Sequence, residues 1–228
     1  PDSLLLKDLN PVQKQAVCAT EGPVLILAGA GSGKTKALTH RAAYIIQEKG
    51  VSPENLLLVT FTNKSSKEMS SRVTKLLNNP SAKPVMGTFH SICARILRKD
   101  GKVLGLGPSF TIYDETDALD AIKQAMDILD IPIQKTSPSS VRHTISQAKN
   151  EMISSTEYPQ YARGFFQEIV AKVYLEYQKI LEKNSAVDFD DLILLTIKMF
   201  QRYPEILQYY QIQYKYIMVD EYQDTNAA

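Results

Sequence analysis

The sequence predicts an α/β protein whose parallel sheet is covered by helices and whose chain is interrupted by a helical insertion. Two observations carry this prediction. In the first hundred residues, short apolar runs alternate with amphipathic helical patterns, as expected for strands buried on both faces. Between about residues 114 and 213 the pattern becomes almost wholly helical, and one further apolar run, at 216–219, then returns to the sheet.

Five apolar runs predict the strands, and the patterns between them predict the helices. The expected strands are 23–28, 56–60, 85–88, 110–113 and 216–219; the expected helices are 10–19, 33–49, 63–77, 89–99, 114–130, 139–151, 164–183 and 189–202. Asn10 before a proline, Asn63 and Asp114 are suited to cap helices, and Gly50 is suited to end one. We therefore expect an α/β domain over 1–110 plus 188–228, with the insertion over 111–187.

Composition excludes several classes of protein. The 228 residues are 44% hydrophobic and 22% charged, unlike a disordered chain, and 26 basic against 25 acidic side chains give a net charge of +1, unlike a histone-like basic arm. A local basic groove is still compatible with this balance. Two cysteines exclude a disulfide framework and favour a reducing compartment, which is the cytoplasm and bacterial nucleoid, or a nucleus. The longest apolar run is too short to cross a membrane, and no leader is visible, so no membrane association is expected.

A glycine-rich segment between an expected strand and an expected helix predicts a phosphate-binding loop. It reads Ala28, Gly29, Ala30, Gly31, Ser32, Gly33, Lys34, Thr35. Glycines let backbone N–H groups point inward, and the helix N-terminus favours an anion. Lys34 can reach the β- and γ-phosphates, and the Thr35 hydroxyl can hold Mg²⁺. Ala28 replaces the first glycine of the usual pattern, and the alternative is a turn that binds nothing.

Two acids follow the last expected strand. Asp220 and Glu221 come directly after 216–219, and the carboxyl ends of parallel strands are where ligands bind. Asp220 is suited to hold Mg²⁺, and Glu221 is suited to polarise an attacking water. A pair of acids in a surface turn is the alternative.

The run Asp220-Glu221-Tyr222-Gln223-Asp224-Thr225-Asn226, together with the segment 28–35, resembles superfamily 1A DNA helicases of the Rep/UvrD/PcrA type. The resemblance implies a RecA-like P-loop NTPase motor domain, termed 1A, with a helical subdomain, 1B, inserted in it. It also implies that ATP and Mg²⁺ are bound, that Gln13 reads the adenine edge and that Gln223 senses the γ-phosphate. Where the family often has an arginine that stacks on adenine, this chain has Lys36.

The same resemblance marks two contacts with single-stranded DNA. The segments Thr60-Phe61-Thr62-Asn63-Lys64 and Gly87-Thr88-Phe89-His90-Ser91 match the family's DNA-contact motifs. An aromatic ring beside small polar donors suits single strands, because bases stack on the ring while the donors hold phosphates. Core aromatics with helix caps are the alternative for both segments. The segment Asp188-Phe189-Asp190-Asp191-Leu192 resembles a further family signature, although acids at a helix start also cap it.

The expected function is therefore an ATP-dependent helicase or translocase on single-stranded DNA and its junctions with duplex, in DNA repair or replication. The catalytic residues would be Lys34, Glu221 and Gln223. The family's second RecA-like domain supplies arginines to the γ-phosphate, so this chain alone is expected to bind ATP–Mg²⁺ weakly and to hydrolyse it very slowly. The alternatives are a non-catalytic, nucleotide-dependent binding module, for which Glu221 and Gln223 would be unnecessary, and an RNA motor. The sequence indicates no oligomeric state.

Overall fold

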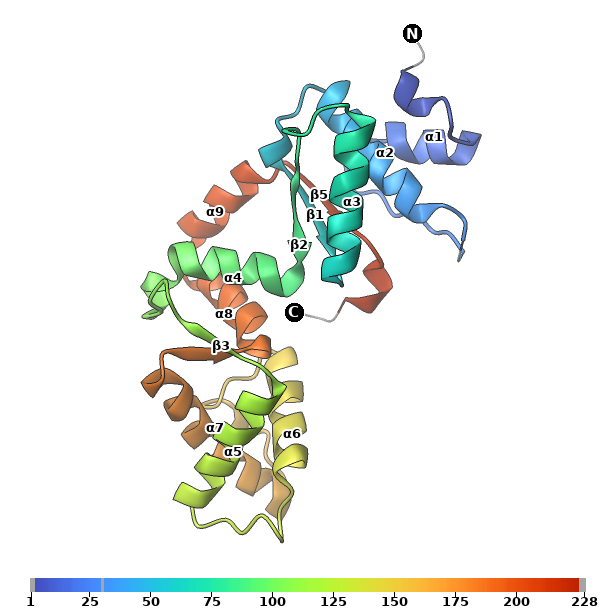
Figure 1. The fold of residues 1–228 in the computed structure, drawn as a ribbon. Helices are drawn as coiled ribbons and strands as arrows, with labels where there is room; N and C mark the ends of the chain where they lie inside the picture. Colours follow the sequence, from blue (N-terminus) through green and yellow to red (C-terminus); the bar gives the residue numbers. More distant parts are fainter. Residues whose placement is uncertain (1–2, 30, 226–228) are drawn as a thin grey trace. The chain divides into compact units, whose positions relative to one another are not determined.

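The computed structural model describes residues 3–29 and 31–225 (Figure 1). The described residues form two compact units. The first holds the chain up to Ile92 together with Leu207–Asp224, and the second holds Cys93–Ile206, within which the insertion expected over 111–187 lies. In the described part of the chain, no helix is long and apolar enough to cross a membrane.

The elements follow the expected order closely. The helices are α1 (Pro11–Cys18), α2 (Lys34–Gln47), α3 (Asn63–Leu76), α4 (Phe89–Asp100), α5 (Glu115–Ile128), α6 (Pro138–Asn150), α7 (Phe165–Lys183), α8 (Phe189–Arg202) and α9 (Pro204–Gln213). The strands are β1 (Leu56–Thr60), β2 (Val85–Thr88), β3 (Thr111–Tyr113), β4 (Ala186–Asp188) and β5 (Tyr216–Val219). Short 3-10 turns occupy Leu4–Leu6, Pro53–Asn55, Gly101–Leu104, Tyr158–Gln160 and Tyr222–Asp224.

The first unit is built on a parallel sheet with the strand order β2-β1-β5 (Figure 1). All five residues of β1 are buried, as the apolar run predicts for a strand covered on both faces. Apolar side chains of α2, α3, β1 and β5 form one core. Asn10 caps α1 as expected, because its side chain accepts the Gln13 N–H while Gln13 Oε1 accepts the Asn10 N–H.

The strand expected over 23–28 does not form. Residues 23–29 make no strand ladder, and Val24, Leu25 and Leu27 are exposed, Leu27 at 85%. The apolar run fits the composition of a buried strand, but a strand also requires a neighbour to pair with its backbone. Neither β5 nor any other described strand pairs with this segment.

The second unit is helical around one core, with a small parallel ladder at its edge. Side chains of α5, α6 and α7 form most of the core. The ladder pairs β3 with β4, so the insertion is not wholly helical. The sequence analysis did not predict β4, because three residues between two long helices are too few to show an alternation of apolar and polar side chains. Asp188 caps α8 in a capping box with Asp191, which confirms the capping interpretation of these acids.

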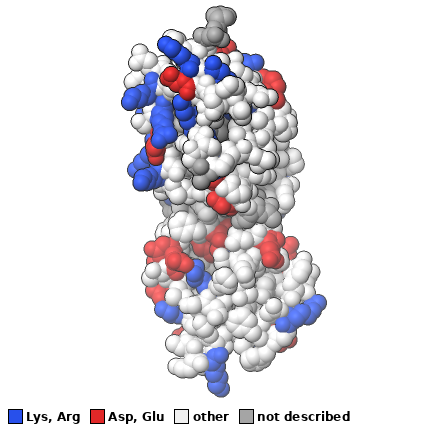
Figure 2. Space-filling model, turned by 90° about the vertical axis from the view of Figure 1, so that its right-hand side faces the viewer, with Lys and Arg blue, Asp and Glu red and all other residues white. Residues whose placement is uncertain are grey.

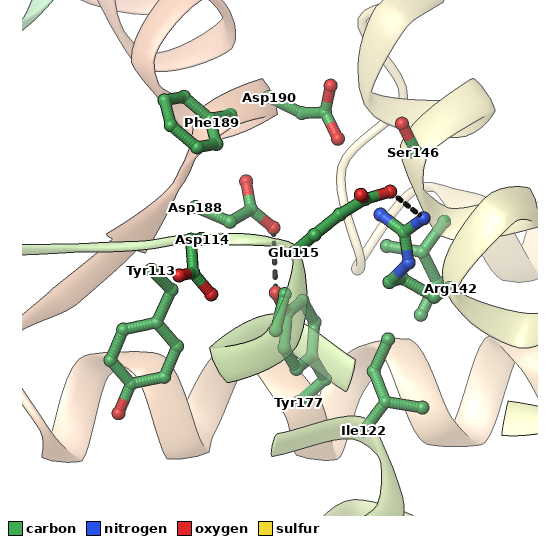
Figure 3. Close-up of a pocket in the computed structure, with 12 residues that line it drawn as sticks. Tyr113, Asp114, Glu115, Ile122, Arg142, Ser146, Tyr177, Asp188, Phe189 and Asp190 are labelled. Carbon is green, nitrogen blue, oxygen red and sulfur yellow. Dashed lines mark hydrogen bonds and ion pairs between the residues drawn. The ribbon is translucent and has the colours of Figure 1, made fainter. Parts of the chain in front are cut away.

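A lysine that the sequence does not single out lies at the centre of this unit. The Lys149 side chain is fully buried, and its Nζ lies 2.6 Å from Asp188 Oδ2 and 2.8 Å from Asp191 Oδ1. The Tyr177 hydroxyl donates to Asp188 Oδ2 at 2.8 Å (Figure 3), and the rings of Tyr174 and Tyr177 lie 5.8 and 5.2 Å from Nζ. The network joins α6 and α7 to the corner between β4 and α8.

Two carboxylates facing one ammonium determine how this network is charged. Burial works to lower the pKa of Lys149, but the charges of Asp191 and Asp188 outweigh it and raise this pKa. Burial works to raise the pKa of Asp188, but Lys149 outweighs it and leaves this pKa below its ordinary value. For Asp191 burial prevails, and its pKa is raised to about 6. Removing Lys149 alone would therefore leave two carboxylates buried without their counter-charge.

We predict that core and exposed leucines of the first unit differ sharply in their contribution to stability. Leu58→Ala, at a fully buried position of β1, should lower the free energy of unfolding by about 2–5 kcal/mol, because it opens a cavity. Leu27→Ala, at an exposed position, should change it by less than about 0.5 kcal/mol. Urea unfolding followed by circular dichroism measures both, and an equal cost at Leu27 would contradict the unpaired state of segment 23–28.

We predict that Lys149→Met lowers the free energy of unfolding of the second unit by about 3–5 kcal/mol, because two buried carboxylates lose their counter-charge. Adding Asp188→Asn and Asp191→Asn to this variant should recover most of the loss, since both amides are neutral and Asn still caps a helix. Equilibrium unfolding of the three proteins tests this. If the triple variant were less stable than Lys149→Met, the carboxylates would not be the source of the cost.

Candidate functional site

The glycine-rich loop leads directly into α2, and its backbone N–H groups are available to bind a ligand. Gly31 and Gly33 have φ values of 73° and 86°, in the left-handed region that glycine adopts without strain. The Ser32 hydroxyl and N–H both donate to Gly29 O, at 2.6 and 3.3 Å, and fold the loop back on itself. Gly33 is the N-cap of α2, and among the residues that the structure describes no side chain caps this helix. The free N–H groups of this turn are therefore suited to bind an anion. Ala30 lies outside the described residues.

Gln13 lies against this loop. Its Nε2 donates to Ser32 O at 3.2 Å, and a Cβ added at Gly33 would come within 2.6 Å of the same nitrogen. The positive φ of Gly33 favours glycine, whereas the Gln13 amide, at the end of a flexible side chain, could shift to admit a Cβ. Lys36 lies on the first turn of α2, and its Nζ donates to Asp8 O at 2.6 Å.

The end of β5 lies within reach of the loop. Lys34 Nζ is 3.4 Å from Glu221 Oε2, although the two residues are far apart in the sequence. The Gln223 amide also donates to Glu221 Oε2. The hydrogen bond from Gln223, and then Lys34, lower the pKa of Glu221. The structure thus brings together the three residues that the sequence analysis named as catalytic.

Asp220 continues the sheet beyond β5, and its negative charge is less well compensated by its surroundings than that of Glu221. Its N–H donates to Val59 O at 3.0 Å, which places it at the carboxyl end of β5 beside the end of β1. Partial burial, and then the Glu221 carboxylate, raise the pKa of Asp220. A cation bound here would relieve both effects.

The donor set fits Mg²⁺. A carboxylate oxygen of Asp220 and the hydroxyl of Thr35 are hard oxygen ligands of the kind this ion prefers. Within the described residues, no cluster of three or more His, Cys, Asp or Glu side chains could hold a metal on its own. Mg²⁺ is usually held by one or two carboxylates together with substrate phosphates and water, so Asp220 and Thr35 would be a sufficient set of protein ligands.

The two aromatic residues expected to contact DNA lie side by side. Thr60 and Thr88 are register partners in the parallel ladder, so Phe61 and Phe89 follow neighbouring strands at the same edge of the sheet. Their ring centroids lie 5.5 Å apart with an interplanar angle of 57°, and Phe61 is 39% exposed. Phe61 therefore packs on Phe89 on one side and keeps accessible ring surface for a base.

The small polar residues beside these rings divide into caps and free donors. Thr62, not Asn63, is the N-cap of α3: its Oγ1 accepts the Ser65 N–H at 3.1 Å. The expectation at Asn63 was wrong because both residue types cap helices, and only the backbone shows where the helix begins. Thr88 Oγ1 likewise accepts the Ser91 N–H at 3.2 Å, while Asn63 and Lys64 are exposed.

The sequence analysis did not predict the part that Ser65 and Ser91 take in capping. Both are the third residue after a threonine that ends or follows a strand, and each donates its N–H to that threonine. Threonine is a preferred N-cap residue, which could have located both caps. His90 is half-buried on the first turn of α4, beside Phe89.

All these residues belong to the first unit, and they lie at one edge of its sheet. The carboxyl ends of β2, β1 and β5 supply Phe89, Phe61 and Asp220, because all three strands run parallel in register. This edge is where parallel α/β sheets bind their ligands. Two acids and an aromatic pair thus lie at one edge of this sheet, and Lys34 of the phosphate loop contacts one of the acids.

Comparison with known proteins shows the family of the chain. The family model described as "UvrD/REP helicase N-terminal domain" matches residues 9–228. The chain is 50% identical over 225 residues to the "ATP-dependent DNA helicase PcrA" of Bacillus subtilis (strain 168), which is 98% of this chain and 30% of that protein. It is 49% identical over 224 residues to the protein of the same name from Staphylococcus aureus (strain Mu50 / ATCC 700699), covering 98% of this chain and 31% of that protein. The chain therefore spans less than a third of these relatives, and it belongs to the UvrD/REP helicase N-terminal domain family.

Proposed function

We propose that this chain is the nucleotide-binding part of an ATP-dependent DNA helicase that moves on single-stranded DNA. The observation that carries the proposal is the contact between Lys34 of the phosphate loop and Glu221 after β5, at 3.4 Å. A residue that binds phosphate and a residue that activates water have to meet at one point for a nucleotide to be hydrolysed there. The relatives named PcrA, which are ATP-dependent DNA helicases by name, support the same function.

The ion pair between Lys34 and Glu221 suggests how ATP binding prepares hydrolysis. Both side chains are about one-third exposed, so the pair contributes little to stability and can be exchanged at low cost. The β- and γ-phosphates of ATP compete with Glu221 for Lys34. Once displaced, Glu221 is free to accept the proton of the attacking water, while Gln223 remains its hydrogen-bond partner and lies next to the place where the γ-phosphate would sit.

The metal site follows from the donor set. Thr35 and Asp220 would hold Mg²⁺ together with the phosphates. The ion, when bound, supplies charge neutralisation on the phosphate oxygens. Asp220 suits this role, because its N–H is fixed on Val59 O and its carboxylate is partly buried near the Glu221 carboxylate, so that a cation would offset both effects.

Single-stranded DNA is the proposed second ligand. Phe61 offers a ring to a base, and Asn63 and Lys64 offer donors to phosphates. The nucleotide and the single-stranded DNA would then both lie at the carboxyl ends of neighbouring β-strands. A structural change caused by loss of the γ-phosphate can therefore be transmitted to the DNA through β1 and β5. Junction preference and full activity belong to the longer protein, whose relatives are about three times the length of this chain. On its own, this chain is proposed to bind ATP weakly and to turn it over very slowly.

Two substitutions at the ion pair should separate ATP binding from hydrolysis. Lys34→Ala should weaken ATP binding roughly 10- to 100-fold, because a charged hydrogen-bond donor to the phosphates is worth about 1.5–3 kcal/mol. Glu221→Gln breaks the same ion pair from the other side, yet it should retain ATP binding while lowering turnover by about 10²-fold or more in the full-length protein. Titration with a fluorescent nucleotide and a phosphate-release assay measure the two effects. Equal loss of binding in both variants would mean that Lys34 acts only through the ion pair.

Removing the exposed ring should weaken binding of single-stranded DNA. We predict that Phe61→Ala costs about 1–3 kcal/mol of affinity, because base stacking is lost, whereas Phe61→Tyr retains most of it. Phe61→Leu keeps an apolar contact with Phe89 and should still lose affinity. Fluorescence anisotropy with a labelled oligonucleotide tests the three variants. If Phe61→Leu bound like the wild type, Phe61 would be a packing residue.

A further inference from the structure

Two side chains of α2 hold the segment that precedes α1. Lys36 Nζ donates to Asp8 O at 2.6 Å, and His40 Nδ1, one turn later on α2, lies 2.7 Å from Leu5 O. Because a carbonyl oxygen only accepts, the His40 ring donates through Nδ1. Residues four apart lie on the same face of a helix, so Lys36 and His40 together fix the chain before α1 along α2.

Lys36 differs from most basic residues of the first unit. Figure 2 shows Lys and Arg side chains gathered along one flank of this unit, and most of its lysines are exposed. Lys36 is half-buried, and its ammonium group is bound to a backbone carbonyl. Hydrogen bonds from a charged donor are among the stronger ones in proteins, so Asp8 O is a firm point of attachment for the segment before α1.

The segment that Lys36 holds continues directly into the capping box of α1. Gln13 Oε1 accepts the Asn10 N–H at 3.1 Å, and Gln13 Nε2 donates to Ser32 O at 3.2 Å. Both neighbours are backbone groups of fixed polarity, so they permit only one of the two orientations of the Gln13 amide. Asn10 lies two residues after Asp8, so the position of its N–H depends on the attachment of Asp8 to α2.

The orientation of the Gln13 amide decides which base it matches. A glutamine amide can make four hydrogen bonds, two through its oxygen and two through its nitrogen, and the described residues occupy one of each. Adenine presents a matching pair on one edge, because its N6 amino group donates and its N7 accepts. Guanine presents two acceptors there, N7 and O6, so the same orientation would set the Gln13 oxygen against O6. A fixed amide therefore favours adenine over guanine.

We propose that Lys36 is a positioning residue for the base of the nucleotide. Its hydrogen bond to Asp8 O holds the segment 8–13 on α2, and it thereby keeps the Gln13 amide in the orientation that matches adenine. The inference rests on the proposed binding of ATP and concerns how the base is selected. Lys36 acts through Gln13, because its ammonium group is bound to Asp8 O and it lacks the planar guanidinium group that stacks on a ring.

A double-mutant cycle tests this role. Lys36→Met removes the donor and should weaken ATP binding by roughly 2- to 10-fold, the range of one hydrogen bond, while reducing the preference for ATP over GTP. In a Gln13→Ala background the same substitution should change neither affinity further, because the group through which Lys36 acts is gone. Lys36→Arg still offers a donor to Asp8 O and should retain the preference. Titration of the full-length protein with ribose-labelled fluorescent ATP and GTP measures each variant.

The matched control is Lys7→Met, which removes an exposed lysine of the same segment and should change neither affinity. Equal weakening of ATP binding by Lys36→Met with and without Gln13 would mean that Lys36 contacts the nucleotide itself, and would overturn the inference. Unchanged affinities in Lys36→Met, or an unchanged preference in Gln13→Ala, would overturn it as well. The proposed function is tested separately by Lys34→Ala, and the nucleotide site fails only if that variant also binds ATP like the wild type.

Discussion

The parallel register of β1 with both of its neighbours is the constraint on which the site depends. Thr60 pairs with Thr88, and Val59 pairs with Val219, so three strands end at the same level. The residues that follow each strand therefore lie at one edge of the sheet, although they are far apart in the sequence. All five residues of β1 are buried, so both faces of this central strand pack against the core.

The charged side chains at that edge of the sheet neutralise one another only in part. Lys34 and Glu221 neutralise each other in an exposed pair, and Asp220 is left beside a second acid. Such a pair suits the proposed binding of a triphosphate, because the ligand's phosphates would compete directly for the lysine. Backbone N–H groups at the start of α2 would be the further phosphate donors.

The second unit uses charge in the opposite way. Lys149 is fully enclosed, with two carboxylates, a tyrosine hydroxyl and two aromatic rings around it. Moving such ions out of water costs free energy, and their mutual attraction offsets this cost only while Lys149 and its carboxylate partners are present together. The network therefore joins α6 and α7 to the corner between β4 and α8 as one assembly. Its closed form contrasts with the exposed pair at Lys34, which can exchange partners.

The sequence by itself determined the features that are encoded within a few neighbouring residues. The glycine-rich loop, the acids after β5, the capping box at Asn10 and the bounds of β1 are all local patterns of this kind. Only the tertiary structure decided the rest, because the deciding partner lies far away in the chain. Pairing left 23–28 outside the sheet although it reads as a strand, and it made a strand of 186–188, which does not. Lys149 looked like any helical lysine until folding enclosed it with Asp188 and Asp191, since burial is a property of the packed chain and not of a short segment.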